Sequence, residues 1–163
     1  MSSTQPAKRK RAPGKVAVQL ATASRGVPLP ALLRRWARAA ASGLTEVTLR
    51  VVGSAEGRRL NRAFRRRDYA TNVLTFAYGR SPWRADIVLC HPVIAREARN
   101  RGIRIAAHYA HLVVHGMLHM RGHDHHRRQD AERMEHAEAR ILARLGYANP
   151  YRMEPGAIES GGR

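Results

Sequence analysis

The sequence from His115 to His125 reads H-G-M-L-H-M-R-G-H-D-H. His115 and His119 are four residues apart, so on a helix their imidazoles lie on one face, one turn apart, where both can bind a single ion. Gly122 can end that helix by adopting a left-handed conformation, and the chain can then bring His125 to the same ion. Three neutral nitrogen ligands with an open fourth position are typical of a catalytic zinc site. We therefore predict one Zn²⁺ per chain, bound by His115, His119 and His125.

The residue after the first histidine bears on what this site can act on. The metzincin proteases share the spacing H-x-x-x-H-x-x-G-x-x-H, but they carry a glutamate there as general base. Here that residue is Gly116. The spacing therefore predicts a hydrolytic metal site without the proteases' base, and the general base stays unassigned. Asp86 and Asp124 are candidates to hydrogen-bond the ligand imidazoles. His108 and His111 are expected to support the metal ligands or to pack against their neighbours.

The charge of the chain narrows the choice of substrate. Its 163 residues include 30 Lys and Arg against 12 Asp and Glu, a formal net charge of +18. Such an excess favours a polyanion, either nucleic acid or an anionic membrane surface. A phosphodiester needs cations around its oxygens, which the arginines can supply. A peptide carbonyl needs the base that Gly116 removes, so charge and spacing favour a nucleic-acid phosphodiesterase over a protease.

The composition along the chain predicts its domain organisation, and the single cysteine indicates the redox compartment. We expect residues 1–14 to form a basic tail without fixed structure, residues 15–151 to form one domain, and residues 152–163 to form a flexible tail. With Cys90 as its only cysteine the chain can form no internal disulfide, which suits a reducing, cytoplasmic compartment. No apolar run approaches the length of a membrane span, so no membrane association is expected.

Hydrophobic periodicity predicts strands separated by helices. The expected strands are 15–24, 45–52, 71–78 and 86–90, and the expected helices are 28–42, 54–67, 91–101, 105–120 and 127–145. Ser81 and Pro82 are a turn signal between two closely spaced strands. This order favours a single mixed sheet with helices packed on it.

The helix expected at 54–67 is unusually basic. We expect Ser54 to cap it and Leu60, Ala63 and Phe64 to form its apolar face. Its six arginines face only one acidic residue within the helix, Glu56; they are Arg58, Arg59, Arg62, Arg65, Arg66 and Arg67. Like charges at helical spacing repel one another, and a phosphate backbone would offset that repulsion.

The last expected helix, 127–145, has an amphipathic pattern. Its inner face is predicted to consist of Met134, Ala137, Ile141 and Leu145. We interpret its alternating glutamates and arginines as an ordinary solvated face.

Several stretches are similar to the motifs of one family. The metal motif matches H-G-x-L-H-L-x-G-Y-D-H, with His123 in place of the tyrosine. Leu60 to Phe76 reads L-N-R-A-F-R-R-R-D-Y-A-T-N-V-L-T-F, and two shorter matches are A-D-I-V-L-C, with Ala85 in place of a glycine, and L-G-Y-A-N-P-Y. With these motifs the chain resembles, over residues 15–151, the YbeY family of bacterial rRNA-maturation endoribonucleases.

This resemblance implies an α+β fold, a single mixed four-stranded sheet with about five helices packed on it and the metal-motif helix central. It implies a metal-dependent single-strand endoribonuclease that acts in 16S rRNA 3′-end maturation and small-subunit ribosome quality control. It implies zinc on His115, His119 and His125, and a functional Arg65 that holds or neutralises the scissile phosphate. The implied partners are the 16S rRNA precursor, the small ribosomal subunit and its assembly proteins, and no DNA.

Two rival functions follow from the same residues. A ribosome-assembly factor could bind RNA through the basic surface while its metal is mainly structural. A metallopeptidase is disfavoured by Gly116 and by the charge. Within the ribonuclease hypothesis, attack by water and attack by the RNA 2′-OH both fit the sequence.

Overall fold

The computed structural model describes residues 14–122 and 127–152. Within these ranges the chain forms one four-stranded sheet and five helices, which confirms the α+β fold. The strands are β1 (Lys15–Leu20), β2 (Thr45–Val52), β3 (Val73–Arg80) and β4 (Trp83–Cys90). The helices are α1 (Pro30–Ala40), α2 (Ser54–Arg65), α3 (His91–Arg101), α4 (Ile105–Met120) and α5 (Arg128–Arg144). None of these helices has the length and apolar character needed to cross a membrane.

The sheet is mixed, with the strand order β1-β2-β4-β3. β1 pairs in parallel with β2, and β2 in parallel with β4. β3 pairs antiparallel with β4 through the turn predicted at Ser81 and Pro82, whose peptide bond is cis. β4 begins at Trp83, earlier than expected, because Trp83 and Arg84 already pair with Thr45 and Glu46 of β2.

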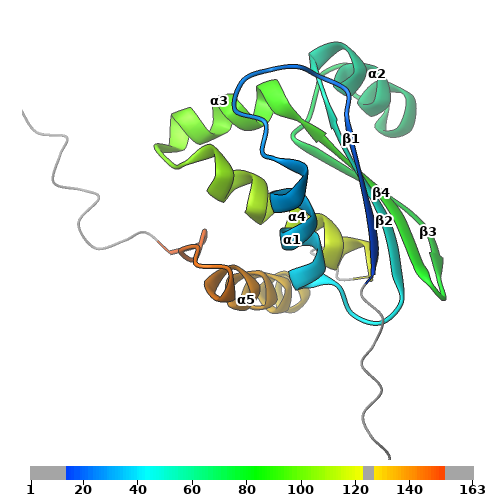
Figure 1. Ribbon diagram of the computed structural model, residues 1–163, viewed down its shortest axis with the longest axis vertical. Coiled ribbons are helices and arrows are strands. Elements are labelled where there is room, and N and C mark those ends of the chain that lie inside the picture. Colours follow the sequence, from blue (N-terminus) through cyan, green and yellow to red (C-terminus); the bar gives the residue numbers. More distant parts are fainter. Residues whose placement is uncertain (1–13, 123–126, 153–163) are drawn as a thin grey trace, which may run out of the picture.

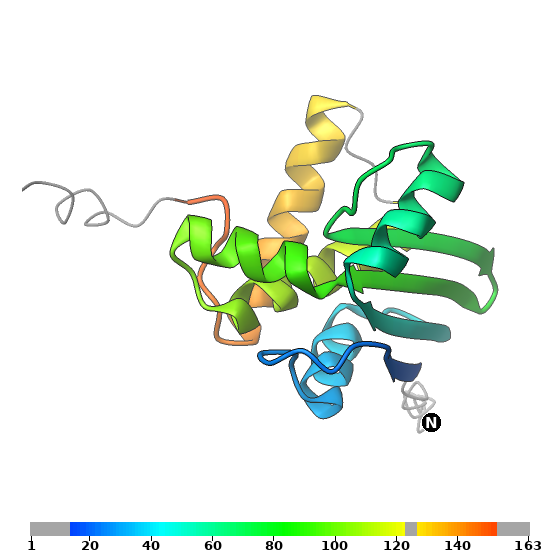
Figure 2. The same ribbon diagram turned by 90° about the horizontal axis from the view of Figure 1, so that it is seen from above.

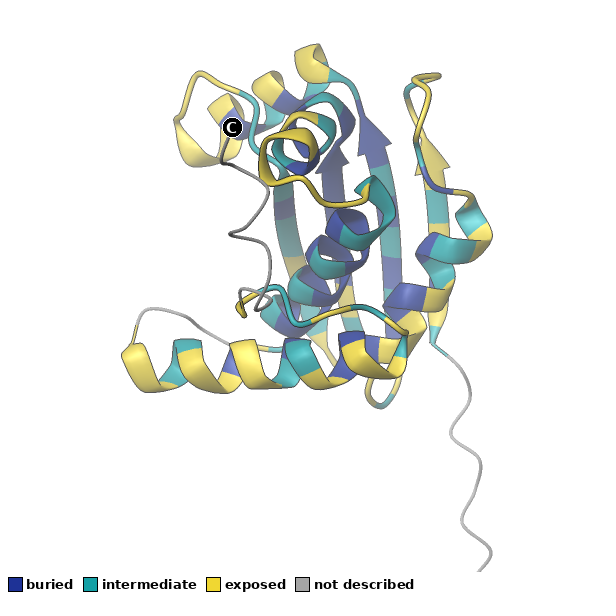
Figure 3. Ribbon diagram, turned by 90° about the vertical axis from the view of Figure 1, so that its left-hand side faces the viewer, coloured by how far each residue is buried: buried dark blue, intermediate teal, exposed yellow. Residues whose placement is uncertain are grey.

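One face of the sheet carries the main core and α4. Leu49, Ile87 and Leu89 from the central strands are fully buried in one cluster with Val113 and Met117 of α4. α4 packs against β3, β4, α1, α3 and α5. Figure 3 shows α4 running across the sheet with much of its surface buried, and Figure 1 shows α1 and α5 beside it. The expectation that the metal-motif helix is central is therefore confirmed.

α2 packs against the opposite face of the sheet, where it contacts β4 and α3 (Figures 1 and 2). The second core cluster lies there and includes Leu74, Val88 and Cys90, with Leu60 of α2 packed against it. Ala63 is exposed and Phe64 is 64% exposed, so the expected apolar face of this helix is wrong for both.

The buried residues of α2 are small or polar. They are Gly57 and Asn61, and a Cβ atom on Gly57 would lie 2.9 Å from the Cys90 Sγ. Asn61 donates from Nδ2 to the Tyr69 carbonyl at 2.7 Å, which ties the helix to the loop that follows it. Ser54 is the first helical residue rather than the cap; Gly53 occupies the cap position, with no side-chain hydrogen bond.

Candidate metal centre

His115 and His119 lie on one face in the C-terminal half of α4, as their spacing predicts. Their ring centroids are 6.2 Å apart and their planes differ by only 6°. α4 ends at Met120, and Gly122 follows with a φ of +83°, so the predicted left-handed glycine is confirmed. Two imidazoles are therefore presented together in the last turns of one helix.

A buried carboxylate on α5 lies behind these histidines. Glu138 is fully buried, and its Oε1 accepts a hydrogen bond from Nδ1 of His115 at 2.6 Å. Its Oε2 accepts from Nε2 of His111 at 2.9 Å and from the hydroxyl of Tyr151. Tyr151 lies beyond the end of α5, so a single carboxylate joins α4, α5 and the segment after α5.

The protonation state of Glu138 follows from this environment. Burial alone raises the pKa of a carboxylic acid, but the hydrogen bonds from His111, His115 and Tyr151 outweigh burial and lower the pKa of Glu138 to about 2. The same contact acts in reverse on Tyr151, where burial and the neighbouring carboxylate raise the phenol pKa. Glu138 is thus a carboxylate at neutral pH that can only accept hydrogen bonds.

The donor set around Glu138 is compatible with a metal ion. One ligand atom each from His111, His115 and Glu138 lies within 4.8 Å of the others. Imidazole nitrogens and carboxylate oxygens are ligands for zinc and for other divalent transition metals. The structure thus supports a metal centre at this end of α4 without identifying the metal.

Four residues of the metal motif or its expected surroundings fall elsewhere or outside the described ranges. His125, Asp124 and His123 lie outside the described residues. Asp86 accepts a hydrogen bond from the hydroxyl of Tyr78 at 2.9 Å in a groove on the α2 side of the sheet. Its neighbour in β4, Ile87, faces α4. Because neighbouring strand residues alternate between faces, the expectation that Asp86 supports the histidines is wrong.

Sequence reasoning missed Glu138, which it assigned to a solvated face. The spacing contains the signal that could have found it. Glu138 lies four residues after Met134 and three before Ile141, both of which are buried in the main core. A glutamate at that spacing falls within the apolar stripe of the helix and therefore needs buried donors.

Arg65 belongs to a different part of the fold from the histidines. It is exposed in the last turn of α2, which packs chiefly against β4 and α3. The arginines around it are partly offset, since Arg58 forms two hydrogen bonds with Asp68 at 2.8 and 2.9 Å. In the described part of the chain no carboxylate pairs with Arg65, so its guanidinium is available to an anion.

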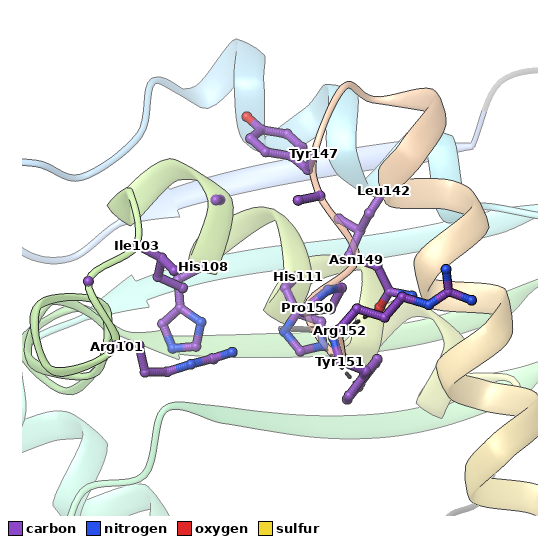
Figure 4. A pocket seen from close by; sticks show the side chains of 13 residues that line it. Arg101, Ile103, His108, His111, Leu142, Tyr147, Asn149, Pro150, Tyr151 and Arg152 are labelled. Atoms are coloured by element: carbon purple, nitrogen blue, oxygen red, sulfur yellow. Dashed lines mark hydrogen bonds between the residues drawn. The ribbon is translucent and has the colours of Figure 1, made fainter. Parts of the chain in front are cut away.

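A cavity of about 550 Å³ opens beside the Glu138 network. It lies between the start of α4 and the segment after α5, and Figure 4 shows His111 and Tyr151 hydrogen-bonded at one side of it. Arg101 and Arg152 add positive charge to its lining. His111 and Tyr151 therefore separate Glu138 from this opening.

Comparison with known proteins places this geometry in a family. The family model for endoribonuclease YbeY matches residues 29–146. A protein named endoribonuclease YbeY from Aromatoleum aromaticum is 60% identical over 125 residues, 76% of this chain and 81% of that protein. Another of that name, from Methylibium petroleiphilum, is 52% identical over 139 residues, 84% of this chain and 93% of that protein. A solution structure of a Thermotoga maritima protein is similar with a TM-score of 0.52 and 25% identity, covering 86% of this chain and 98% of that one.

Proposed function

This chain belongs to the endoribonuclease YbeY family, and we propose that it is a metal-dependent enzyme that cleaves single-stranded RNA internally. The observation that carries the proposal is the pair His115 and His119, stacked on α4, with His115 hydrogen-bonded to the buried carboxylate of Glu138. An ordered imidazole pair with a carboxylate behind it fits a metal ion in both donor chemistry and orientation.

We further propose that the metal is zinc and that His115, His119 and His125 bind it. When bound, the ion supplies a Lewis acid that lowers the pKa of a coordinated water and can turn it into a nucleophile. The donor chemistry supports zinc, since neutral imidazoles suit this ion and a three-histidine set leaves one position open.

The protein's own residues act on the phosphate and its path. Arg65 is proposed to hold the scissile phosphate and to offset the negative charge that develops on its oxygens. Arg62 and Arg66 are exposed on the same end of α2 and extend this cationic surface along the RNA backbone. The net charge of +18 attracts RNA over a longer range.

The proposed substrate is the 16S rRNA precursor, cleaved during 3′-end maturation and small-subunit quality control in the cytoplasm. Its partners would be the small ribosomal subunit and its assembly proteins. An assembly factor that binds RNA without cutting it would need the same basic surface. The partly exposed, oriented imidazole pair favours cleavage, because RNA binding alone needs no such site.

An RNA cleavage assay tests this proposal. Purified wild-type protein, His115→Ala and His136→Ala are incubated with a precursor 16S rRNA 3′ fragment, a single-stranded RNA and an RNA duplex. His136 is exposed on α5 and serves as the matched control. We expect wild type and His136→Ala to cleave the single-stranded regions and His115→Ala to be at least about 100-fold slower.

Two further readouts make the assay decisive. If every variant binds RNA and wild type cleaves no faster than His115→Ala, the protein is a binding factor and the catalytic proposal is wrong. The product ends identify the nucleophile: a 2′,3′-cyclic phosphate indicates attack by the 2′-OH, whereas attack by water leaves no cyclic phosphate.

A further inference from the structure

We infer that Glu138 is a positioning residue of the metal centre: it holds His115 by its Nδ1–H, so that Nε2 of His115 binds the metal, and it is not itself a ligand. The inference rests on the proposed metal site of His115, His119 and His125. It assigns a role to the buried carboxylate and selects which nitrogen of His115 faces the ion.

The distances separate a positioning role from direct coordination. Two ligand atoms on one tetrahedral zinc, each about 2.0–2.1 Å from it, lie about 3.3 Å apart. The Glu138 Oε1 is only 2.6 Å from Nδ1 of His115, and its Oε2 is only 2.9 Å from Nε2 of His111. Both separations are hydrogen-bond lengths and both are shorter than the spacing of two ligand atoms on a tetrahedral zinc.

Hydrogen bonds also occupy most of the acceptor positions of Glu138. Its two oxygens accept from three donors, on His115, His111 and Tyr151, and no part of the residue is exposed. A carboxylate with three strong donors in a dry site gains little by exchanging them for a metal bond. Its geometry is that of a carboxylate that orients a metal-binding imidazole and raises its basicity.

The same contacts engage Nε2 of His111 with Glu138. That nitrogen donates to Glu138, and its ring meets the ring of Tyr151 edge-on at 5.4 Å. His111 and Tyr151 therefore fix the carboxylate from the side of the cavity, while His115 extends from it towards the end of α4. Tyr151 and His111 thus hydrogen-bond to Glu138, and Glu138 hydrogen-bonds to His115. In the inferred arrangement, His115 in turn binds the metal ion.

Zinc affinity tests this arrangement. Wild type, Glu138→Gln, Glu138→Ala and His119→Ala are titrated with zinc against a chromogenic chelator, after circular dichroism has confirmed folding. Glu135, exposed on the same helix, provides the matched controls Glu135→Gln and Glu135→Ala. X-ray absorption of the zinc-loaded proteins counts the ligands, and ¹⁵N NMR reports which nitrogen of His115 carries a proton.

We expect Glu138→Ala to lose about 10- to 100-fold in zinc affinity and Glu138→Gln to lose less, because the amide oxygen can still accept from His115. The Glu135 variants should bind as wild type does. The number of zinc ligands should be the same in wild type and Glu138→Gln, with Nδ1 of His115 protonated in both. If Glu138→Ala does not fold, the inference is tested by the number of zinc ligands in Glu138→Gln and by the NMR signal of the His115 nitrogens.

Two outcomes overturn the inference. One is a Glu138→Ala protein that folds and binds zinc as tightly as wild type. The other is the loss of one oxygen ligand in Glu138→Gln, which would make Glu138 a direct ligand. His119→Ala tests the underlying site separately: if it binds zinc like wild type, the proposed ligand set fails, whatever the Glu138 variants do.

Discussion

A Cβ atom on Gly116 would lie 3.1 Å from both Cδ1 and Cγ2 of Ile87. The position directly after the first metal-motif histidine therefore faces the sheet, on the buried side of α4. A glutamate there would enter the core instead of the metal centre. In this fold the absence of the proteases' base follows from the close packing of α4 on β4, and the base for RNA cleavage has to come from another element or from the RNA.

Gly116→Ala should lower the free energy of unfolding by about 1–2 kcal/mol, because Ile87 is fully buried and cannot move away from the added methyl group. The gain in helix propensity, about 1 kcal/mol, opposes this effect without cancelling it. Urea unfolding of the zinc-free protein measures the change, since bound metal would mask it. A more stable Gly116→Ala protein would show that α4 does not approach the sheet this closely.

Gly57 and Cys90 should be energetically coupled, since the close approach of α2 to the sheet depends on this pair. Gly57→Ala would place a methyl group 2.9 Å from the Cys90 Sγ and should cost about 1–3 kcal/mol. Cys90→Ala removes that sulfur and leaves a small cavity that costs about 1 kcal/mol. In the double variant the added methyl group fills the cavity. The double variant should therefore lose less stability than the two single variants lose in sum. Additive losses in a double-mutant cycle would contradict the packing described for α2.

Arg65→Glu should reduce RNA cleavage much more than RNA binding. Its proposed contact is with the scissile phosphate, where charge develops in the transition state, and we expect a loss of at least about 100-fold in rate. Arg35→Glu on α1, also exposed, changes the net charge equally and is the matched control. Both variants should weaken binding by a similar factor at one salt concentration. Equal cleavage rates for Arg65→Glu and Arg35→Glu would show that Arg65 contributes only general positive charge.

His108 should make the protein less stable in acid. It is 3% exposed, and burial lowers its pKa against a partial offset from Glu97, whose Oε1 is 3.5 Å away. The unfolded chain therefore takes up a proton near pH 6.5 while the folded one does not, and stability falls as the pH drops below that value. One such proton contributes at most about 1.4 kcal/mol per pH unit.

Unfolding free energies of His108→Gln and of wild type, measured between about pH 7.5 and 5, test this expectation. The difference between the two proteins should shrink as the pH falls, because the variant lacks the group that resists protonation. His136→Gln, at an exposed position on α5, should follow wild type throughout. A difference that is constant with pH would contradict a buried neutral imidazole at position 108.

The periodic parts of the sequence predicted the fold well. The alternation of Val47, Leu49 and Val51 gives β2, and these three residues are buried in the main core as that pattern indicates. The helix of the metal motif was predicted with the bounds that α4 has, Ile105–Met120. Helix and strand periods are local properties of a sequence, so no knowledge of tertiary contacts was needed.

The face of α2 and the role of Glu138 could not be predicted in the same way. α2 meets the sheet through Gly57, and a glycine carries no hydrophobic signal although the close approach of two backbones depends on it. The spacing of Glu138 places it in the apolar stripe of α5, but its partners His111 and His115 come from α4, and the pattern of α5 alone does not identify them. Both features depend on which elements meet in three dimensions.

The central claim is that the histidines of α4 hold a metal ion on which RNA cleavage depends. Its most direct test is the cleavage rate of chelator-treated wild-type protein as zinc is restored stepwise, with His119→Ala measured in parallel. The rate should rise in proportion to bound zinc and level off near about one zinc per chain, while His119→Ala binds RNA but stays inactive. Zinc-free protein that cleaves single-stranded RNA as fast as the restored protein would contradict the account.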